Sequence, residues 1–352
     1  MHVAMQTLVL VGTLLVTAGC GEGRPRVRLG CLPYPHTWTF FEVADPASLG
    51  VHQYDESPFL ARSTEIERGI VYTCDAGFLD IAHMRITIDW VRYMAAHVEE
   101  ALAAGEPGFK VYGRELTWYD VRFDYPADWE AMDAGERDEL ITELAIRIGS
   151  ELAYDVVTWH EIITWFGYKR WVVIPEDPSA FTYEDVMSHV IGLRVADRAL
   201  RDGERTFDEA VTAALSDELQ ALGALTPEGT LQAIDLVEGR WWIGDESLVR
   251  HLDIGLGDGI VEPMLVPGID ARADGGSMTF ALPSLADVCG RDLRGFYEVR
   301  IETGIREGDK LRELLPAQPE RFDPRTHFGA MMEQIEREVR TQTPRIVRCG
   351  GA

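Results

Sequence analysis

The longest regular pattern of apolar and polar positions lies in the middle of the chain, at residues 133–167. Apolar residues recur there every three or four positions, which predicts one long helix with a continuous buried face. Asp133 and Glu136 form a capping-box pattern before this stripe, and Gly167 follows it. We therefore expect the helix to begin and end near these residues.

Shorter patterns predict further elements on both sides of this helix. A three- and four-residue spacing predicts a helix over residues 79–104, and alternation over 111–125 predicts one or two strands. A last helix is expected at about 328–340. Three further helices open with N-terminal capping signals, which are Thr182 with Asp185, Thr206 with Glu209, and Thr226 before Pro227.

The segments outside these helices are rich in proline, glycine and short apolar runs, which indicate irregular strands and loops. Neither an internal repeat nor a low-complexity linker divides the chain. The sequence thus predicts one large α+β domain with a helical centre and irregular β and loop segments at both ends. Its extended N-terminal segment is 21–76, and residues 77–352 form the helical core, a β/loop region and a C-terminal helix of the same domain.

An uninterrupted apolar run at residues 8–16 precedes this domain. It is shorter than the ~20 residues that a transmembrane helix needs, and its length is typical of a signal peptide. Small residues then lead to Cys20, in a pattern that resembles the lipobox of bacterial lipoproteins. We predict a signal peptide over residues 1–20 and a lipid anchor on Cys20, and Gly21 after it favours the outer membrane. An ordinary cleaved signal peptide with an incidental cysteine is the alternative. No Lys or Arg precedes the run, whereas signal peptides normally begin with positive charge.

The chain is strongly acidic, with 33 Lys and Arg residues against 59 Asp and Glu residues and a net charge of −26. Such a surface repels the phosphates of nucleic acids and anionic lipid headgroups. We therefore expect no nucleic acid partner. Membrane association is expected through the lipid on Cys20 and not through a basic patch.

Cysteine usage is compatible with export. The cysteines besides Cys20 are Cys31, Cys74, Cys289 and Cys349. An even number in an oxidising compartment allows two disulfides, and buried free thiols are the alternative. Cys74 also precedes a predicted helix, where a lowered thiol pKa would make it a nucleophile. The residues around it lack the usual shape of a cysteine-peptidase turn, so a disulfide or an inert thiol is favoured.

Two histidines on predicted helix faces are candidates for chemistry. His160 and Glu161 lie near the end of the long helix, but Thr164 replaces the second histidine of an HExxH zinc motif, so the chain is not a zincin. Asp80 and His83 are three residues apart and share a helix face, so both could bind one metal ion, or Asp80 could orient His83. Buried hydrogen-bonded histidines and a helix-capping aspartate are the structural alternatives.

An acidic pair lies at the start of the helix predicted from residue 182. Either Glu184 or Asp185 could complete a His/carboxylate site, although acidic residues in a first helical turn also stabilise the helix dipole. We keep Glu184 as a predicted ligand and interpret Asp185 as a cap.

Four motifs carry a resemblance to a known family. They are GFLDIAHMR at 77–85, HEIITWFG at 160–167, the segment 179–188, and LVPG at 265–268. In combination they resemble a family of bacterial envelope lipoproteins known as domain of unknown function 4056. The resemblance covers most of the mature chain and implies no established activity. It does imply that the motifs belong to one constellation, so we expect His83 and His160 to lie close together.

Two classes of function follow. In the first, the protein is a metal-dependent hydrolase of the cell envelope that acts on a cell-wall, lipid or peptide substrate. The predicted ligands of a divalent metal such as zinc are His83, His160, Asp80 and Glu184. Glu161 would act as the general base on a metal-bound water if it falls beside the site.

In the second class, the protein is a non-catalytic binding or assembly lipoprotein whose buried polar residues hold helices together. Converging, solvent-reachable histidine and carboxylate groups would favour the hydrolase. Sealed histidines, each bonded to one neighbour, would favour the non-catalytic protein.

Overall fold

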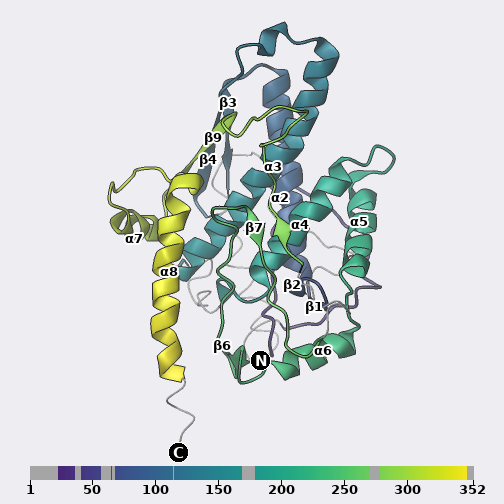
Figure 1. Ribbon diagram of the computed structural model, residues 1–352, viewed down its shortest axis with the longest axis vertical. Coiled ribbons are helices and arrows are strands. Elements are labelled where there is room, and N and C mark those ends of the chain that lie inside the picture. Colours follow the sequence, from purple (N-terminus) through teal and green to yellow (C-terminus); the bar gives the residue numbers. More distant parts are fainter. Residues whose placement is uncertain are drawn as a thin grey trace, which may run out of the picture.

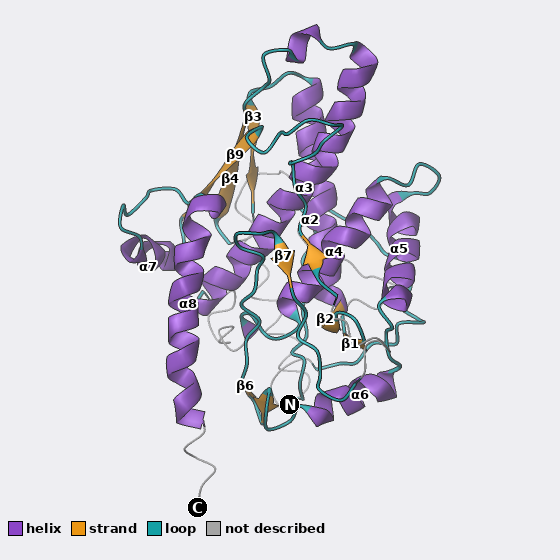
Figure 2. Cartoon of the chain, viewed as in Figure 1, coloured by secondary structure: helices purple, strands orange, loops and turns teal. Residues whose placement is uncertain are grey.

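The computed structural model describes residues 23–35, 41–56, 65, 68–113, 115–168, 179–269 and 278–346. The predicted signal peptide, Cys20 and Cys349 lie outside these residues. As predicted, the described chain is one α+β domain in which helices predominate and the sheets are small (Figure 2).

Three helices form the centre of the domain: α2 (Ile81–Ala103), α3 (Ala134–Trp165) and α4 (Asp185–Leu200). Helix α2 packs against both α3 and α4. The remaining helical elements are η1 (Trp129–Ala131), α5 (Phe207–Ala221), α6 (Pro227–Leu236), α7 (Arg306–Leu314) and α8 (Pro324–Ile346). Figure 1 shows α4 and α5 on one side of the central pair and α7 and α8 on the other.

Local capping signals explain where these helices start. The Asp133 side chain accepts a hydrogen bond from the N–H of Gly135 at the start of α3. Thr206 and Glu209 form a complete capping box on α5. Thr226 caps α6, with a proline in its first turn. These predicted starts are confirmed, because each depends on residues only two or three positions apart.

The main sheet has three antiparallel strands in the order β3 (Gly108–Tyr112), β4 (Thr117–Phe123) and β9 (Tyr297–Thr303). The first two are the strands predicted over 111–125. In its register Tyr119 lies opposite Val111 on one side and Ile301 on the other. The sheet thus joins a hairpin from the first half of the chain to a strand from its last quarter, on one side of the helical centre (Figure 1).

The other sheets are two-stranded. They are β1 (Ile70–Thr73) with β2 (Gly77–Asp80), β5 (Trp242–Ile243) with β6 (Glu246–Ser247), and β7 (Ile260–Val261) with β8 (Phe280–Ala281). The hairpin β1–β2 matters most for function, since β2 runs directly into α2 at Asp80.

A close approach of α4 to α2 sets the position of the site. A Cβ on Gly192 of α4 would lie 2.7 Å from the backbone oxygen of Met84. Only glycine therefore allows the two helices to come this near. The contact brings the first turns of α2 and α4 together, beside His83. Within the described part of the chain, no helix is both long and apolar enough to cross a membrane.

Candidate metal centre

Asp80 connects strand β2 to helix α2 and fixes the direction of the first helical turn. Its Oδ1 accepts a hydrogen bond of 2.9 Å from the N–H of Ala82, which is the N-cap interaction of α2. Its Oδ2 accepts one of 2.7 Å from the N–H of Cys31 and lies 3.5 Å from Nδ1 of His83. Both oxygens therefore serve the backbone, and Asp80 orients His83 from one side.

The turn before α4 holds two neighbouring carboxylates. The N–H of Thr182 donates to Oδ2 of Asp185 at 2.6 Å, as in a capping box, and the Thr182 hydroxyl lies 2.8 Å from Oε1 of Glu184. The other oxygen of each carboxylate, Oε2 of Glu184 and Oδ1 of Asp185, is buried without a hydrogen-bond partner.

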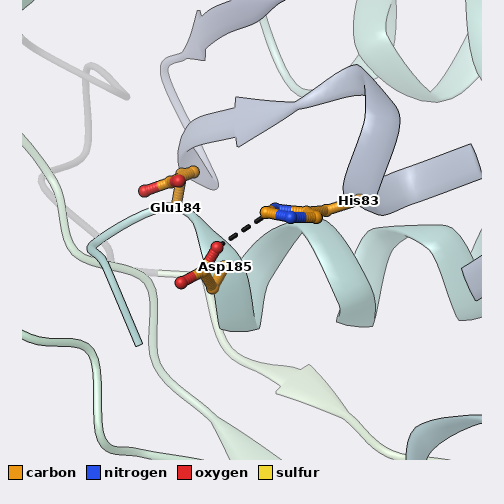
Figure 3. A group of neighbouring side chains, drawn as sticks. All are labelled: His83, Glu184 and Asp185. Atoms are coloured by element: carbon orange, nitrogen blue, oxygen red, sulfur yellow. Dashed lines mark ion pairs between the residues drawn. The ribbon is translucent and has the colours of Figure 1, made fainter. Parts of the chain in front are cut away.

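These carboxylates face the histidine of α2. His83, Glu184 and Asp185 each offer one ligand atom, and these atoms lie within 4.8 Å of one another. Nδ1 of His83 is 3.0 Å from Oδ1 of Asp185, and the two side chains form an ion pair when His83 is protonated (Figure 3). The His83 side chain is 18% exposed, but its Nδ1 and both carboxylates are buried. We call these three residues the metal-ligand group.

Gly30 covers the other edge of the His83 ring. A Cβ at this position would lie 2.5 Å from Nε2 of His83 and 3.1 Å from Oδ2 of Asp80. The N-terminal segment can therefore pass over the ring only with glycine here. This contact leaves Nδ1 of His83 as the nitrogen that faces the carboxylates.

A second histidine and a third carboxylate lie beside the metal-ligand group. Glu161 of α3 is buried, and its Oε2 accepts a 3.0 Å hydrogen bond from the N–H of Phe181. Its Oε1 lies 4.0 Å from Nε2 of His189, whose ring centre is 5.4 Å from that of His83. Phe181 itself has a φ of +55°, a strained conformation for this residue type. Glu161 thus falls beside the site, one of the two outcomes left open by the sequence.

The electrostatics of the site show an excess of buried negative charge. Burial and the neighbouring Asp185 raise the pKa of Glu184 well above its usual range, and burial raises that of Asp80. Burial alone would lower the pKa of His83, but the carboxylates of Asp80, Asp185 and Glu161 raise it to about 10. Without a metal, a proton on His83 is therefore the positive charge at the centre of this group.

The pKa of Glu161 is shifted downward, opposite to the pKa shifts of Glu184 and Asp80. Burial acts to raise its pKa, but the surrounding imidazoles of His189, His160 and His83 lower it to about 2. Glu161 is thus a carboxylate at neutral pH.

Comparison with known proteins places the chain in a family. The model of one family matches residues 16–252, which is more than half of the chain. The chain belongs to the family described as "Protein of unknown function (DUF4056)". Neither a curated protein nor a solved structure matches it. The matched residues of this DUF4056 chain include the whole metal-ligand group, together with Glu161 and His189.

The structure distributes the predicted site residues of this DUF4056 protein over two places. His83 and Glu184 come together, with Asp80 behind the histidine. His160 contacts Glu115 instead, with 3.1 Å between its Nδ1 and Oε1 of that residue. His160 is not part of the metal-ligand group, and its role as a ligand stays a prediction.

Two further residues belong to the site: Asp185, which the sequence analysis considered as a ligand but interpreted as a cap, and His189, which it did not consider. Asp185 does cap the turn through Oδ2, as interpreted, but its Oδ1 also faces His83. His189 follows Asp185 by four residues, the spacing of neighbours on one helix face. That spacing is the signal that could have identified both.

The described cysteines do not contribute to the site as nucleophiles. Cys31, Cys74 and Cys289 are free thiols, so the two-disulfide alternative does not hold for them. Burial and the neighbouring Asp75 raise the pKa of Cys74, which is the opposite of nucleophile activation.

Proposed function

We propose that this DUF4056 protein binds a divalent metal ion between α2 and α4 and uses it for hydrolysis. One observation carries the proposal: an imidazole and two buried carboxylates converge from two helices. His83, Glu184 and Asp185 each offer one ligand atom within 4.8 Å of the others, and Oε2 of Glu184 is buried without a hydrogen-bond partner. Unpaired buried polar atoms cost free energy, which a bound cation would offset.

The chemistry of the donors favours a particular kind of ion. Imidazole and carboxylate ligands suit zinc and related divalent transition metals. Three protein ligands leave a coordination position for water, as catalytic zinc sites do. The His83 side chain is 18% exposed at the edge of the group, whereas the ligand atoms are buried, so entry of substrate would require side chains around His83 to move.

Hydrolysis requires a base and a polarised water. The metal would supply a water of lowered pKa, and Glu161 is the carboxylate placed to accept its proton. Asp80 would keep the His83 ring in place. The substrate class is a cell-wall, lipid or peptide component of the envelope, to which the lipid on Cys20 would confine the enzyme.

Zinc titration of the purified protein tests the metal site. The expected result is one tightly bound ion per chain, absent from a His83→Ala variant and retained by His327→Ala, a control on α8. A wild-type protein that binds no zinc, or a His83→Ala variant that binds it equally well, would overturn the proposal.

The anchor has a separate test. Cys20→Ser should abolish labelling by a radioactive fatty acid and move the protein from the membrane fraction to the soluble one, since the thiol carries the lipid. Unchanged labelling of the variant would contradict a lipid on Cys20 and leave the metal site unaffected.

A further inference from the structure

His189 lies one turn after Asp185 on α4 and is almost completely buried. Its Nδ1 is 2.9 Å from the hydroxyl oxygen of Thr87 on α2. Its Nε2 has no hydrogen-bond partner, although it faces the carboxylate of Glu161 at 4.0 Å. The unpartnered nitrogen therefore belongs to the same buried region as the metal-ligand group.

The Thr87 hydroxyl determines which nitrogen of His189 carries hydrogen. Thr87 donates its single proton to the backbone oxygen of His83, at 3.0 Å. A backbone carbonyl can only accept, so the Thr87 proton is used in this bond. The hydroxyl has no second proton for His189, and it therefore accepts a hydrogen bond from Nδ1–H of His189. A neutral imidazole that holds its proton on Nδ1 carries its lone pair on Nε2, the nitrogen that faces the site.

We propose that His189 is a further ligand of the metal ion, bound through Nε2, and that Thr87 is the positioning residue that fixes the required tautomer. This inference rests on the proposed function, and with a fourth protein ligand the water would take a fifth coordination position, which zinc can accommodate. Ligand bonds to zinc are about 2.0–2.2 Å long, so an ion bound to Nε2 of His189 would also lie close to Oε1 of Glu161. His189 is outside the metal-ligand group, so its coordination requires a small shift of side chains around the ion.

Thr87 makes the kind of hydrogen bond that residues next to metal-binding histidines usually make. Such histidines use their second nitrogen to donate to a protein oxygen, which fixes the ring and its tautomer. Thr87 does so while also bonding the backbone of His83, and it thereby ties the two histidines together. A histidine with only a structural role would gain nothing from an unpaired buried Nε2.

Substitution of Thr87 tests the inference with a matched pair. Thr87→Val removes the hydroxyl at nearly constant volume, and Thr87→Ser keeps it. In zinc titrations of the full chain, Thr87→Val should weaken binding about 10–100-fold, the range for lost outer-shell partners. Thr87→Ser should bind zinc as the wild type does. Equal affinities of wild type and Thr87→Val would overturn the role of Thr87.

A double-mutant cycle separates coordination from general stability. His189→Ala should weaken zinc binding more than Thr87→Val, and Thr87→Val should have no further effect in its presence. The visible absorption spectrum of the cobalt-loaded protein should also change with His189→Ala, since it reports the ligand set. Additive effects of the two substitutions, or an unchanged cobalt spectrum, would overturn the inference.

The proposed function and this inference fail in distinguishable ways. If wild type binds no zinc, or His83→Ala binds it normally, both fall. If zinc binding depends on His83 but not on His189 or Thr87, only the present inference is overturned. Should His189→Ala not fold, the Thr87 pair still decides the question.

Discussion

Two clusters of buried charged side chains lie along the first turns of α2, and they differ in how their charges are balanced. The carboxylate cluster contains Asp80, Glu161, Glu184 and Asp185 with His83 and His189. The arginine cluster contains Arg26, Arg28, Arg85, Glu65 and Asp89 with His52. Both are shielded from solvent, and α2 contributes residues to both.

Opposite charges meet throughout the arginine cluster. Nη1 of Arg28 is 2.6 Å from Oε1 of Glu65, and its Nε is 2.8 Å from Oδ2 of Asp89. Arg26 and Arg85 also form ion pairs with Glu65. The cluster thereby attaches the N-terminal segment to α2, a short distance along the chain from Gly30, which packs on His83.

The carboxylate cluster has no comparable balance. Its four carboxylates surround two imidazoles, and no arginine forms a direct ion pair with His83's partners Asp80 and Asp185 among the described residues. A buried charge needs a partner of opposite sign. The arginine cluster sets three guanidinium groups and one imidazole against two carboxylates, whereas the carboxylate cluster sets two imidazoles against four carboxylates, with Arg250 as a further electrostatic partner. A bound cation would improve the charge balance of the carboxylate cluster.

The largest expected effect on the free energy of unfolding comes from a substitution in the arginine cluster. Glu65→Gln leaves Arg26, Arg28 and Arg85 around a neutral side chain, and removing one partner of a buried ion pair costs about 3–5 kcal/mol. Chemical denaturation should therefore show a loss of this size in the free energy of unfolding. Glu246→Gln, at an exposed position of β6, serves as the matched control and should change stability by less than about 0.5 kcal/mol.

A smaller loss would remove the contrast between the clusters. If Glu65→Gln costs under about 1 kcal/mol, as exposed ion pairs do, then the arginine cluster does not need its charges and the comparison fails.

The two clusters also differ in how far the sequence could predict them. Capping signals and apolar spacing predicted most helices because those signals are local, as with Thr206 and Glu209. Residue type and motif context also identified His83 and Glu184. The arginine cluster was not predicted, because Glu65 and Arg28 lie in segments without a periodic pattern.

Contacts between residues far apart in the chain were also not predicted from the sequence. Strand β9 joins β4 across more than half of the chain, and no local pattern near Tyr297 indicates this partner. His160 shows the same limit at the site, because its contact Glu115 comes from the connection between β3 and β4. Such contacts depend on tertiary packing, which single-sequence periodicity does not report.

Zinc should stabilise the protein through the carboxylate cluster. At a free zinc concentration 100-fold above the dissociation constant, mass action predicts about 2.7 kcal/mol of added stability. Thermal unfolding with and without zinc would measure it, and Glu65→Gln should keep this increment if it folds. Glu184→Gln removes a ligand charge and should lose most of it. An equal increment in Glu184→Gln and wild type would place zinc elsewhere.

The smallest expected effect is a difference between the two clusters in how the stability of the metal-free protein depends on pH. The pKa of Glu184 is raised above its ordinary value of 4.5, mainly by burial and then by Asp185. Its contribution to stability is thus complete below pH 4.5 and is lost as the pH rises through the folded-state pKa. Asp89 has a lowered pKa because the charge of Arg28 and the His52 hydrogen bond outweigh its burial. Its contribution is present above its ordinary pKa of 3.8 and is lost on acidification.

The two clusters should therefore respond to pH with opposite signs, and Glu184→Gln isolates the carboxylate part. Between pH 5 and pH 8, metal-free wild type should lose stability relative to Glu184→Gln, at a limiting slope of about 1.4 kcal/mol per pH unit. Urea denaturation in the presence of a chelator gives both curves, and Glu246→Gln should remain parallel to wild type. Parallel curves for Glu184→Gln and wild type would mean that the Glu184 charge is already balanced within the chain. The contrast with the arginine cluster, and the need for a cation, would then disappear.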